Sequence, residues 1–137
     1  MRILGLDLGT KTLGVSISDN LGIIASKYGL IEFNEEDYDD ALIKLKKIVD
    51  EFNITTVVLG LPKNMDNTIG FAGERSLNFK KKLEEIGLDV ILEDERLSSV
   101  EANNILIKGN TRRDKRKKEV DSIAAVIILQ RYLDRRV

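Results

Sequence analysis

The sequence has no cysteine, no histidine and no tryptophan, and it has a single proline. Without cysteine the chain has no disulfide, no thiol nucleophile and no thiolate metal ligand. Without histidine it also lacks the commonest general base and the commonest transition-metal ligand. An enzyme built on this chain therefore has to use carboxylates, Lys, Ser, Thr or Tyr. Carboxylate oxygens favour hard cations such as Mg²⁺ or Mn²⁺.

Long hydrophobic runs are absent as well. No stretch approaches the roughly 20 apolar residues of a membrane span, and the start has no signal-peptide pattern, so we expect a cytoplasmic protein without a membrane partner. A length of 137 residues favours one domain over residues 1–137. The net charge is −1, yet residues 112–118 are all cationic except Asp114. Such a segment suits a polyanion, although a solvated charged loop is its commoner explanation.

Hydrophobic patterning in the first half predicts three strands and a helix. Near-continuous aliphatic residues predict a strand over 3–8 that is covered on both faces. Alternation over 13–18 predicts a strand with one buried face, and residues 23–32 complete an antiparallel meander. Acids that follow Asn34 predict a helix capped by that residue, with apolar positions at three- and four-residue spacing through Phe52.

The second half predicts parallel additions to this sheet. It contains a strand over 54–61 that Pro62 ends, a helix over 72–86 closed by Gly87, and a strand over 88–92. A short helix over 98–108 is capped by Ser98 and Glu101, and a last helix starts near 118 after the basic loop. Right-handed crossovers then give an α/β fold with a mixed five-stranded sheet, three antiparallel strands followed by two parallel ones, and helices on both faces.

Asp7 is the unusual residue of the first strand. An ionised carboxylate among aliphatic residues costs several kcal/mol unless a metal, a cation or hydrogen bonds compensate it. The turn that follows, Gly9-Thr10-Lys11, offers backbone and hydroxyl donors of the kind found where a chain meets phosphate or metal. The alternative is that Asp7 sits at the strand end and caps this turn.

Further acids are expected at the same sheet edge. Asp94 and Glu95 follow the strand over 88–92, and Asp121 lies in the first turn of the predicted last helix. Sites of such sheets gather where parallel strands end, so these carboxylates can line a site for one or two Mg²⁺ ions that supports phosphodiester cleavage. Each acid also has a structural explanation: Asp121 complements the helix dipole, and Asp94 and Glu95 form surface ion pairs with Arg96.

Polar residues after the strand over 54–61 allow two interpretations. Asn and Asp favour turns for local reasons, which explains the loop over 63–70 without any function. The functional alternative is that Lys63 and Asn64 contact the backbone of a substrate.

Four segments in this order resemble a known family: Gly5-Leu-Asp-Leu-Gly-Thr-Lys11, Gly60-Leu-Pro-Lys-Asn-Met-Asp66, Asp94-Glu-Arg-Leu-Ser-Ser99 and Val120-Asp-Ser-Ile-Ala-Ala125. The family is the bacterial pre-16S rRNA nucleases, also described as Holliday-junction-resolvase-like proteins. The resemblance implies a ribonuclease H-like fold and metal-dependent cleavage that processes the 5′ end of precursor 16S rRNA.

The resemblance also implies site residues. Asp7, Glu95 and Asp121 would be the catalytic acids and the ligands of Mg²⁺ or Mn²⁺, with Asp94 as a less certain neighbour. Supporting or substrate contacts would come from Thr10, Lys11, Asn64, Asp94 and Arg96. The residues expected to bind nucleic acid are Lys63, Arg112, Arg113, Lys115, Arg116, Lys117 and Lys118.

One departure and three alternatives stay open. Related junction resolvases carry their second acid at the end of strand four, where this chain has Gly60-Leu61-Pro62, so the second acid has to come from strand five. A Holliday-junction resolvase acting on branched DNA would be an obligate dimer, and a non-catalytic nucleic-acid-binding or regulatory protein would not need Asp7. The phosphate loop of actin-like ATPases is also similar, but those proteins need a second domain. Monomer or homodimer, and any ribosomal particle as partner, stay undecided.

Overall fold

Five strands form one mixed sheet in the computed structural model, which describes residues 1–63, 66, 68–94 and 113–136. The sheet order is β3-β2-β1-β4-β5. The strands are β1 (Leu4–Leu8), β2 (Thr12–Ser18), β3 (Ala25–Glu32), β4 (Thr56–Leu61) and β5 (Asp89–Asp94). β2 pairs antiparallel with β1 and β3, whereas β4 runs parallel to β1 and β5 parallel to β4. The predicted sheet is confirmed.

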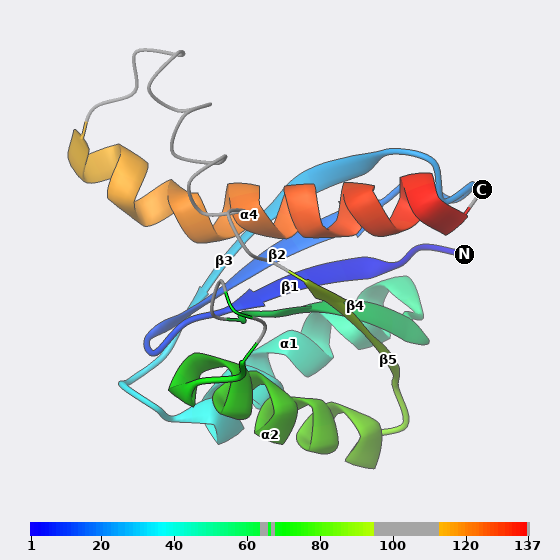
Figure 1. Ribbon diagram of the computed structural model, residues 1–137. Helices are drawn as coiled ribbons and strands as arrows, with labels where there is room; N and C mark the ends of the chain where they lie inside the picture. The colour runs from blue at the N-terminus through cyan, green and yellow to red at the C-terminus, as the bar shows by residue number, and fades with distance from the viewer. Residues whose placement is uncertain (64–65, 67, 95–112, 137) are drawn as a thin grey trace.

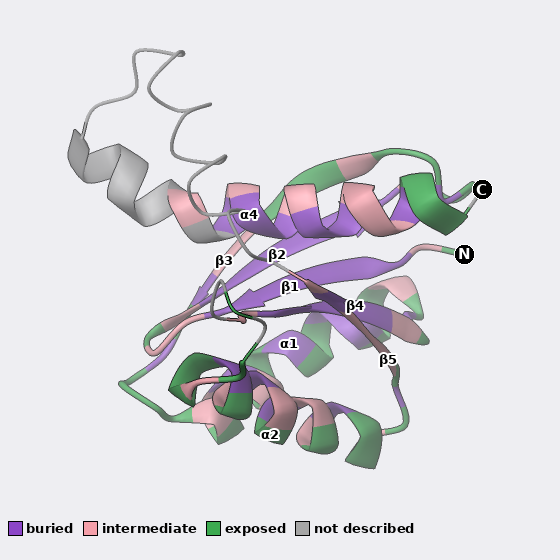
Figure 2. Ribbon diagram, in the orientation of Figure 1, coloured by how far each residue is buried: buried purple, intermediate pink, exposed green. Residues whose placement is uncertain are grey.

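Helices cover both faces of this sheet (Figure 1). α1 (Tyr38–Phe52) and α2 (Phe71–Glu85) lie on one face, and α4 (Arg113–Arg136) crosses the other. The larger hydrophobic core lies under α1 and α2, and a smaller one that includes Ile3, Val58 and Leu129 lies under α4. β1 is consequently buried along its whole length, and β2 and β4 are buried except at their first residues (Figure 2). In the described part of the chain, no helix is long and apolar enough to cross a membrane.

The polar face of β2 is buried, contrary to the prediction of a strand with one exposed face. All residues from 13 to 18 are buried because α4 packs across the side that carries Gly14, Ser16 and Ser18. The Ser16 hydroxyl donates to the carbonyl of Ala125 at 2.7 Å, and the Ser18 hydroxyl accepts from the Ile3 amide at 2.8 Å. Small hydroxyl side chains pass for surface residues in a sequence pattern, yet here their hydrogen bonds are satisfied inside the protein.

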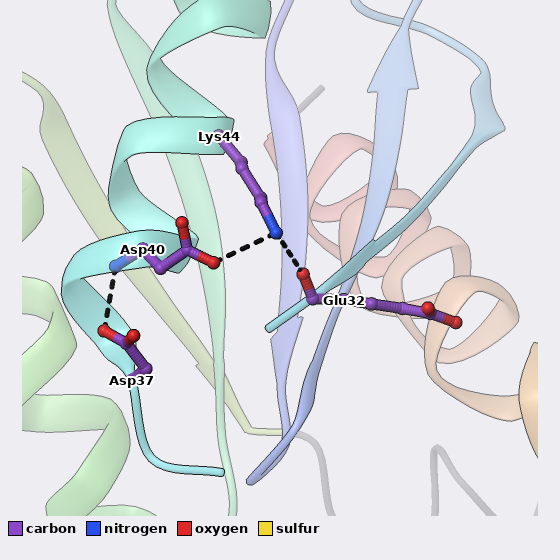
Figure 3. A network of polar contacts seen from close by, with 4 residues as sticks. All are labelled: Glu32, Asp37, Asp40 and Lys44. Atoms are coloured by element: carbon purple, nitrogen blue, oxygen red, sulfur yellow. Dashed lines mark hydrogen bonds and ion pairs between the residues drawn. The ribbon is translucent and has the colours of Figure 1, made fainter. Parts of the chain in front are cut away.

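α1 begins later than predicted. Its N-cap is Asp37, whose carboxylate accepts from the Asp40 amide at 3.2 Å (Figure 3). Asn34 instead closes a turn, because its carbonyl accepts from the Asp37 amide at 2.8 Å. The helix therefore starts after Asp37, because the side chain of that residue accepts a hydrogen bond from an amide of the first turn. Lys44 then joins α1 to the end of β3, with its ammonium 3.0 Å from Asp40 and 2.7 Å from the Glu32 carbonyl.

The second half agrees with the prediction in the order of its described elements, and two of the boundary differences bear on the site. Gly87 follows α2 with φ of 93°, as a helix-terminating glycine should. β5 continues to Asp94, two residues beyond the predicted strand, because it pairs with β4 up to Leu61. α4 starts at Arg113 rather than near 118, since Lys and Arg are good helix formers and no Gly or Pro interrupts them. The predicted helix over 98–108 lies outside the described residues.

Candidate active site

Asp7 lies at the carboxyl end of β1 and faces α4. Leu4, Leu6 and Leu8 point into the core under α1 and α2, so strand alternation directs Gly5 and Asp7 to the other side. Asp7 is 5% exposed. Burying a carboxylate costs several kcal/mol unless hydrogen bonds, a cation or a metal compensate it.

Glycines occupy the positions level with Asp7 on β2 and, if the register is continued, on β4. Gly14 of β2 is its pairing partner. On the other side the pairing of β1 with β4 ends with Leu6 beside Leu59, and continuing this register by one residue would place Asp7 level with Gly60 of β4. Neither glycine has a side chain to fill the space next to the carboxylate. The sheet therefore leaves room around Asp7 on the face that α4 covers.

α4 approaches β1 very closely one step before Asp7. A Cβ built on Gly5 would lie 2.6 Å from Cβ of Leu129 and 2.7 Å from the carbonyl oxygen of Ala125, and it would also collide with the Ser16 hydroxyl. Only glycine permits this contact. The absence of a side chain at Gly5 thus sets the distance between α4 and β1 next to the site.

The same contact sets which part of α4 lies near Asp7. Ile3 belongs to the cluster with Ile128, Leu129 and Leu133, whereas Gly5 contacts Ala125 and Leu129, so the strand and the helix run in opposite directions. Two strand residues advance about 6.6 Å, and four helix residues about 6 Å. The backbone of residue 121, one turn before Ala125, is therefore the part of α4 expected beside Asp7.

Residue 121 lies in the third turn of α4, which corrects the prediction of a first-turn position. The helix dipole acts mainly in the first turn, so it no longer explains an acid at this place. The Asp121 side chain itself lies outside the described residues.

β5 presents its last two acids to opposite faces. Val90 and Leu92 pack against the core under α2, whereas Ile91 packs against the cluster under α4. Alternation then directs Asp94 to the α2 face and Glu93 to the α4 face, which Asp7 shares. Glu95, the predicted second catalytic acid, lies outside the described residues, as does Arg96.

Glu93 is an acid that the sequence patterning missed. It is 7% exposed, and Nη1 of Arg135 lies 2.7 Å from each of its carboxylate oxygens. This hydrogen bond and the opposite charge raise the pKa of Arg135. The prediction ended the strand at Leu92 and so assigned Glu93 to a loop. Continuing the alternation by one residue would have found it, and the ion pair ties the end of α4 to β5.

The turn after β1 has structural partners. The Gly9 amide donates to the Thr12 carbonyl at 2.8 Å, and the Thr10 carbonyl accepts from the Glu36 amide at 2.8 Å. The half-exposed side chain of Thr10 and the exposed side chain of Lys11 lie at the same sheet edge as Asp7. They stay candidates for substrate contacts.

The remaining predicted contacts divide into described and undescribed residues. After β4, Asp66 accepts from the amide and hydroxyl of Thr68 at 3.1 and 2.6 Å, which lowers its pKa and agrees with a turn-forming role. Lys63 is half-buried, and Asn64 lies outside the described residues. Of the basic segment, Arg112 is outside them too. Arg113 and residues 115–118 belong to the first turns of α4, so this segment is helical and not the predicted loop.

Within the described residues, no group of three or more acids is close enough to hold a metal ion. This statement does not cover two of the three predicted ligands, because Glu95 and the Asp121 side chain lie outside the described part.

The sheet order, a buried acid late in the central strand and a long helix across it define the ribonuclease H-like class of nuclease folds. Solved structures agree: RuvC of Thermus thermophilus in complex with a Holliday junction substrate has a TM-score of 0.59 at 12% identity, covering 99% of this chain and 95% of that one. The fowlpox virus resolvase in complex with Holliday junction DNA has a TM-score of 0.59 at 16% identity, covering 100% and 99%.

The chain belongs to the RuvX family, described as Holliday junction resolvase, whose family model matches residues 1–135. It is 51% identical over 135 residues to "Putative pre-16S rRNA nuclease" of Geobacillus sp. (strain WCH70) and 49% identical to the protein of that name from Bacillus subtilis (strain 168). Each match covers 98% of both chains. The predicted family resemblance and fold class are confirmed, and the protein is a nuclease by family.

Proposed function

We propose that this protein is a divalent-metal-dependent nuclease that processes the 5′ end of precursor 16S rRNA in the cytoplasm. The observation that carries the proposal is Asp7, a carboxylate only 5% exposed on the α4 face of the central strand, with Gly14 as its partner on β2. The names of the curated relatives supply the substrate.

Asp7, Glu95 and Asp121 would hold one or two Mg²⁺ or Mn²⁺ ions. The chain has neither histidine nor cysteine, so carboxylate oxygens are the only strong ligands available, and these suit a hard cation. The bound ions would supply Lewis-acid activation of water and stabilisation of the leaving oxygen. Support for Asp121 comes from the register of α4, which brings residue 121 toward Asp7.

The protein's own residues would orient the reacting groups. Gly5 and the hydrogen bond from Ser16 to Ala125 keep α4 at a fixed height, so an acid on the helix and an acid on the strand keep a fixed separation. Thr10, Lys11 and Lys63 lie at the edge where the substrate would pass. The cationic first turns of α4 would attract its phosphates, because a cluster of positive charges favours a polyanion.

Asp7→Asn tests this proposal, with Asp50→Asn as the matched control. Asp50 is an exposed acid of α1 whose ion pair with Lys46 lies at the surface. Both variants and the wild type would be incubated with end-labelled precursor 16S rRNA, single-stranded RNA and a four-way DNA junction, in Mg²⁺, Mn²⁺ or EDTA. We expect cleavage of precursor rRNA to need metal and to fall more than about 100-fold in Asp7→Asn, because loss of a direct ligand should exceed the roughly 10- to 100-fold cost of losing a residue that only supports a ligand. Asp50→Asn should cleave like the wild type.

A Holliday-junction resolvase is the second candidate, favoured by the description of the family. Metal-dependent cutting of the junction, without cutting of precursor rRNA, would select it. If the wild type cleaves none of the substrates while it binds them, both enzymatic hypotheses are wrong and the protein is a nucleic-acid-binding protein.

A further inference from the structure

A surface depression between the starts of α1 and α2 has no role in the proposed chemistry. Its wall on α2 includes Phe71, Arg75 and Asn78, and Tyr38 of α1 lies opposite. We propose that this depression binds one unpaired nucleotide of the substrate strand, with Phe71 stacking on the base and Arg75 contacting a phosphate. The inference rests on the proposed function, to which it adds a preference for single-stranded nucleic acid.

Phe71 is the first residue of α2 and is 87% exposed. No other large hydrophobic side chain in the described part of the chain is as exposed. The ring therefore contributes little to the core, and its faces are accessible to a ligand. An exposed aromatic ring offers a stacking surface for any base, which is how many proteins hold single strands.

Polar groups continue from Phe71 along the same side of α2. Arg75 and Asn78 follow at four- and seven-residue spacing, which places them on the same helix face as the ring. No ion pair occupies Arg75 within the residues that the structure describes, whereas Lys82, one turn beyond Asn78, is held by Asp39 at 2.8 Å. The order along the helix is aromatic ring, guanidinium and amide, which are groups suited to a base, a phosphate and a base edge.

Tyr38 supplies an additional polar group. Its ring makes edge-to-face contacts with Phe33 and Phe79, at centroid distances of 5.6 and 6.2 Å, which fix its orientation. Its hydroxyl oxygen is buried and has no hydrogen-bond partner among the described residues. Burial raises the pKa of Tyr38 above its ordinary value, and the protonated phenol keeps an unused donor that a bound nucleotide would reach if it displaced the side chains that cover the hydroxyl.

The depression also contains acids, which argue for a nucleotide rather than a duplex backbone. Glu36 and Glu74 line it together with Arg75. This mixed charge gives little general attraction for the closely spaced phosphates of a duplex. Carboxylates can instead accept hydrogen bonds from base amino groups or from a ribose hydroxyl, which are accessible on an unpaired nucleotide.

The depression opens on the same sheet edge as Asp7. A Cβ on Gly73 would lie 2.7 Å from the Pro62 carbonyl oxygen, so the first turn of α2 sits directly against the end of β4. The opposite wall is joined to the turn after β1, because the Glu36 amide donates to the Thr10 carbonyl. In Figure 1 the starts of α1, α2 and α4 and the turn between β1 and β2 all lie on one side of the molecule. Asp7 lies on the α4 face and the depression on the α1/α2 face, so a substrate strand that passes Asp7 would reach the depression by crossing this edge of the sheet.

Binding should be measured on the full chain in EDTA, so that the result does not depend on cleavage. The probe is a short single-stranded RNA carrying 2-aminopurine, whose fluorescence is quenched by stacking, with an RNA duplex of the same sequence as the comparison. The variants are Phe71→Ala, Phe71→Leu, Phe71→Trp and Arg75→Gln. Leu21→Ala is the matched control, because Leu21 is 76% exposed but lies in the turn between β2 and β3.

We expect Phe71→Ala and Phe71→Leu to weaken binding of the single strand about 5- to 100-fold, the loss that corresponds to one stacked base. Phe71→Trp should retain affinity and quenching, and Leu21→Ala should bind like the wild type. Arg75→Gln should lower the salt dependence by about one phosphate contact. Duplex binding should be unchanged in all Phe71 variants.

Unchanged single-strand affinity in Phe71→Ala would overturn the inference. So would full affinity in Phe71→Leu, since an apolar contact without stacking would then suffice, or equal losses for duplex and single strand. The two hypotheses are separable. Metal-dependent cleavage that needs Asp7 but not Phe71 would leave the proposed function intact and remove this site. If no substrate is cleaved but Phe71→Ala still loses affinity for the single strand, the proposed function is wrong and this binding site stands.

Discussion

Replacing Gly5 with alanine is expected to push α4 away from β1 and to lower both stability and cleavage. The added Cβ would lie 2.6 Å from Cβ of Leu129 and 2.7 Å from the Ala125 carbonyl oxygen. Ordinary contacts of such atoms are about 3.5–4.0 Å, so α4 has to shift by about 1 Å. Neither contact can be relieved by a side-chain rotation, because one atom is backbone and the other is fixed to it.

The magnitude follows from three contributions. Overpacking of a filled core costs about 1–3 kcal/mol. The displaced helix also weakens the hydrogen bond from Ser16 to Ala125, now 2.7 Å long, which contributes about 0.5–1.5 kcal/mol. Replacing glycine lowers the conformational entropy of the unfolded chain, which offsets about 0.4–1 kcal/mol of this loss. The net loss in the free energy of unfolding should be about 0.5–4 kcal/mol.

Gly29→Ala is the matched control, because Gly29 is also a strand glycine of this sheet but a Cβ there meets nothing within 4 Å. Urea denaturation of both variants and the wild type gives the free energies of unfolding. A 1 Å displacement of a positioning element can cost about 10²-fold in rate, so metal-dependent cleavage by Gly5→Ala should fall on that scale. Equal stability of the Gly5 and Gly29 variants would refute the close approach of α4 as the feature that sets the site.

Two further predictions concern charged groups. Arg135→Ala leaves the buried Glu93 carboxylate without its cation. The melting temperature of this variant should lie below that of the Glu93→Gln, Arg135→Ala double variant, which has no unpaired buried charge. Equal melting temperatures would contradict this. Asp19 accepts from the amides of Ile23 and Ile24 at 2.7 and 3.1 Å, and these bonds lower its pKa from 3.8. Because the pKa is lower in the folded protein, ionised Asp19 stabilises the fold above pH 3.8, and this stabilisation is lost as the pH falls through the folded-state pKa. The difference in the free energy of unfolding between wild type and Asp19→Ala should therefore become smaller in acid. A difference that does not change with pH would refute this prediction.

Local patterns in the sequence were sufficient for the order of the elements. The aliphatic run around Asp7, the alternation after it and the helical spacing from Tyr38 to Phe52 each depend on a period that neighbouring residues impose. The lack of histidine and cysteine limited the chemistry to oxygen ligands. The four motifs indicated the family, which the similarity to known proteins confirmed.

Boundaries and faces near the site needed the tertiary structure. Pairing with β4 extends β5 to Asp94, and this extension decides that Glu93 shares a face with Asp7. The alternation in β5 can be continued to Glu93, but only the pairing with β4, some thirty residues earlier in the chain, decides that the strand extends that far. The start of α4 at Arg113 likewise moves residue 121 from the first turn to the third.

By itself, the sequence determined the order of the described strands and helices and the acids available for chemistry, because hydrophobic periodicity and residue type act over short distances. The tertiary structure alone decided that Ser16 is buried and that α4 rests on Gly5. Both depend on a helix more than a hundred residues away packing across the sheet. The sequence does not show why glycine is needed at position 5, because the need arises only from the packing of α4 against β1. That packing brings residue 121 toward Asp7.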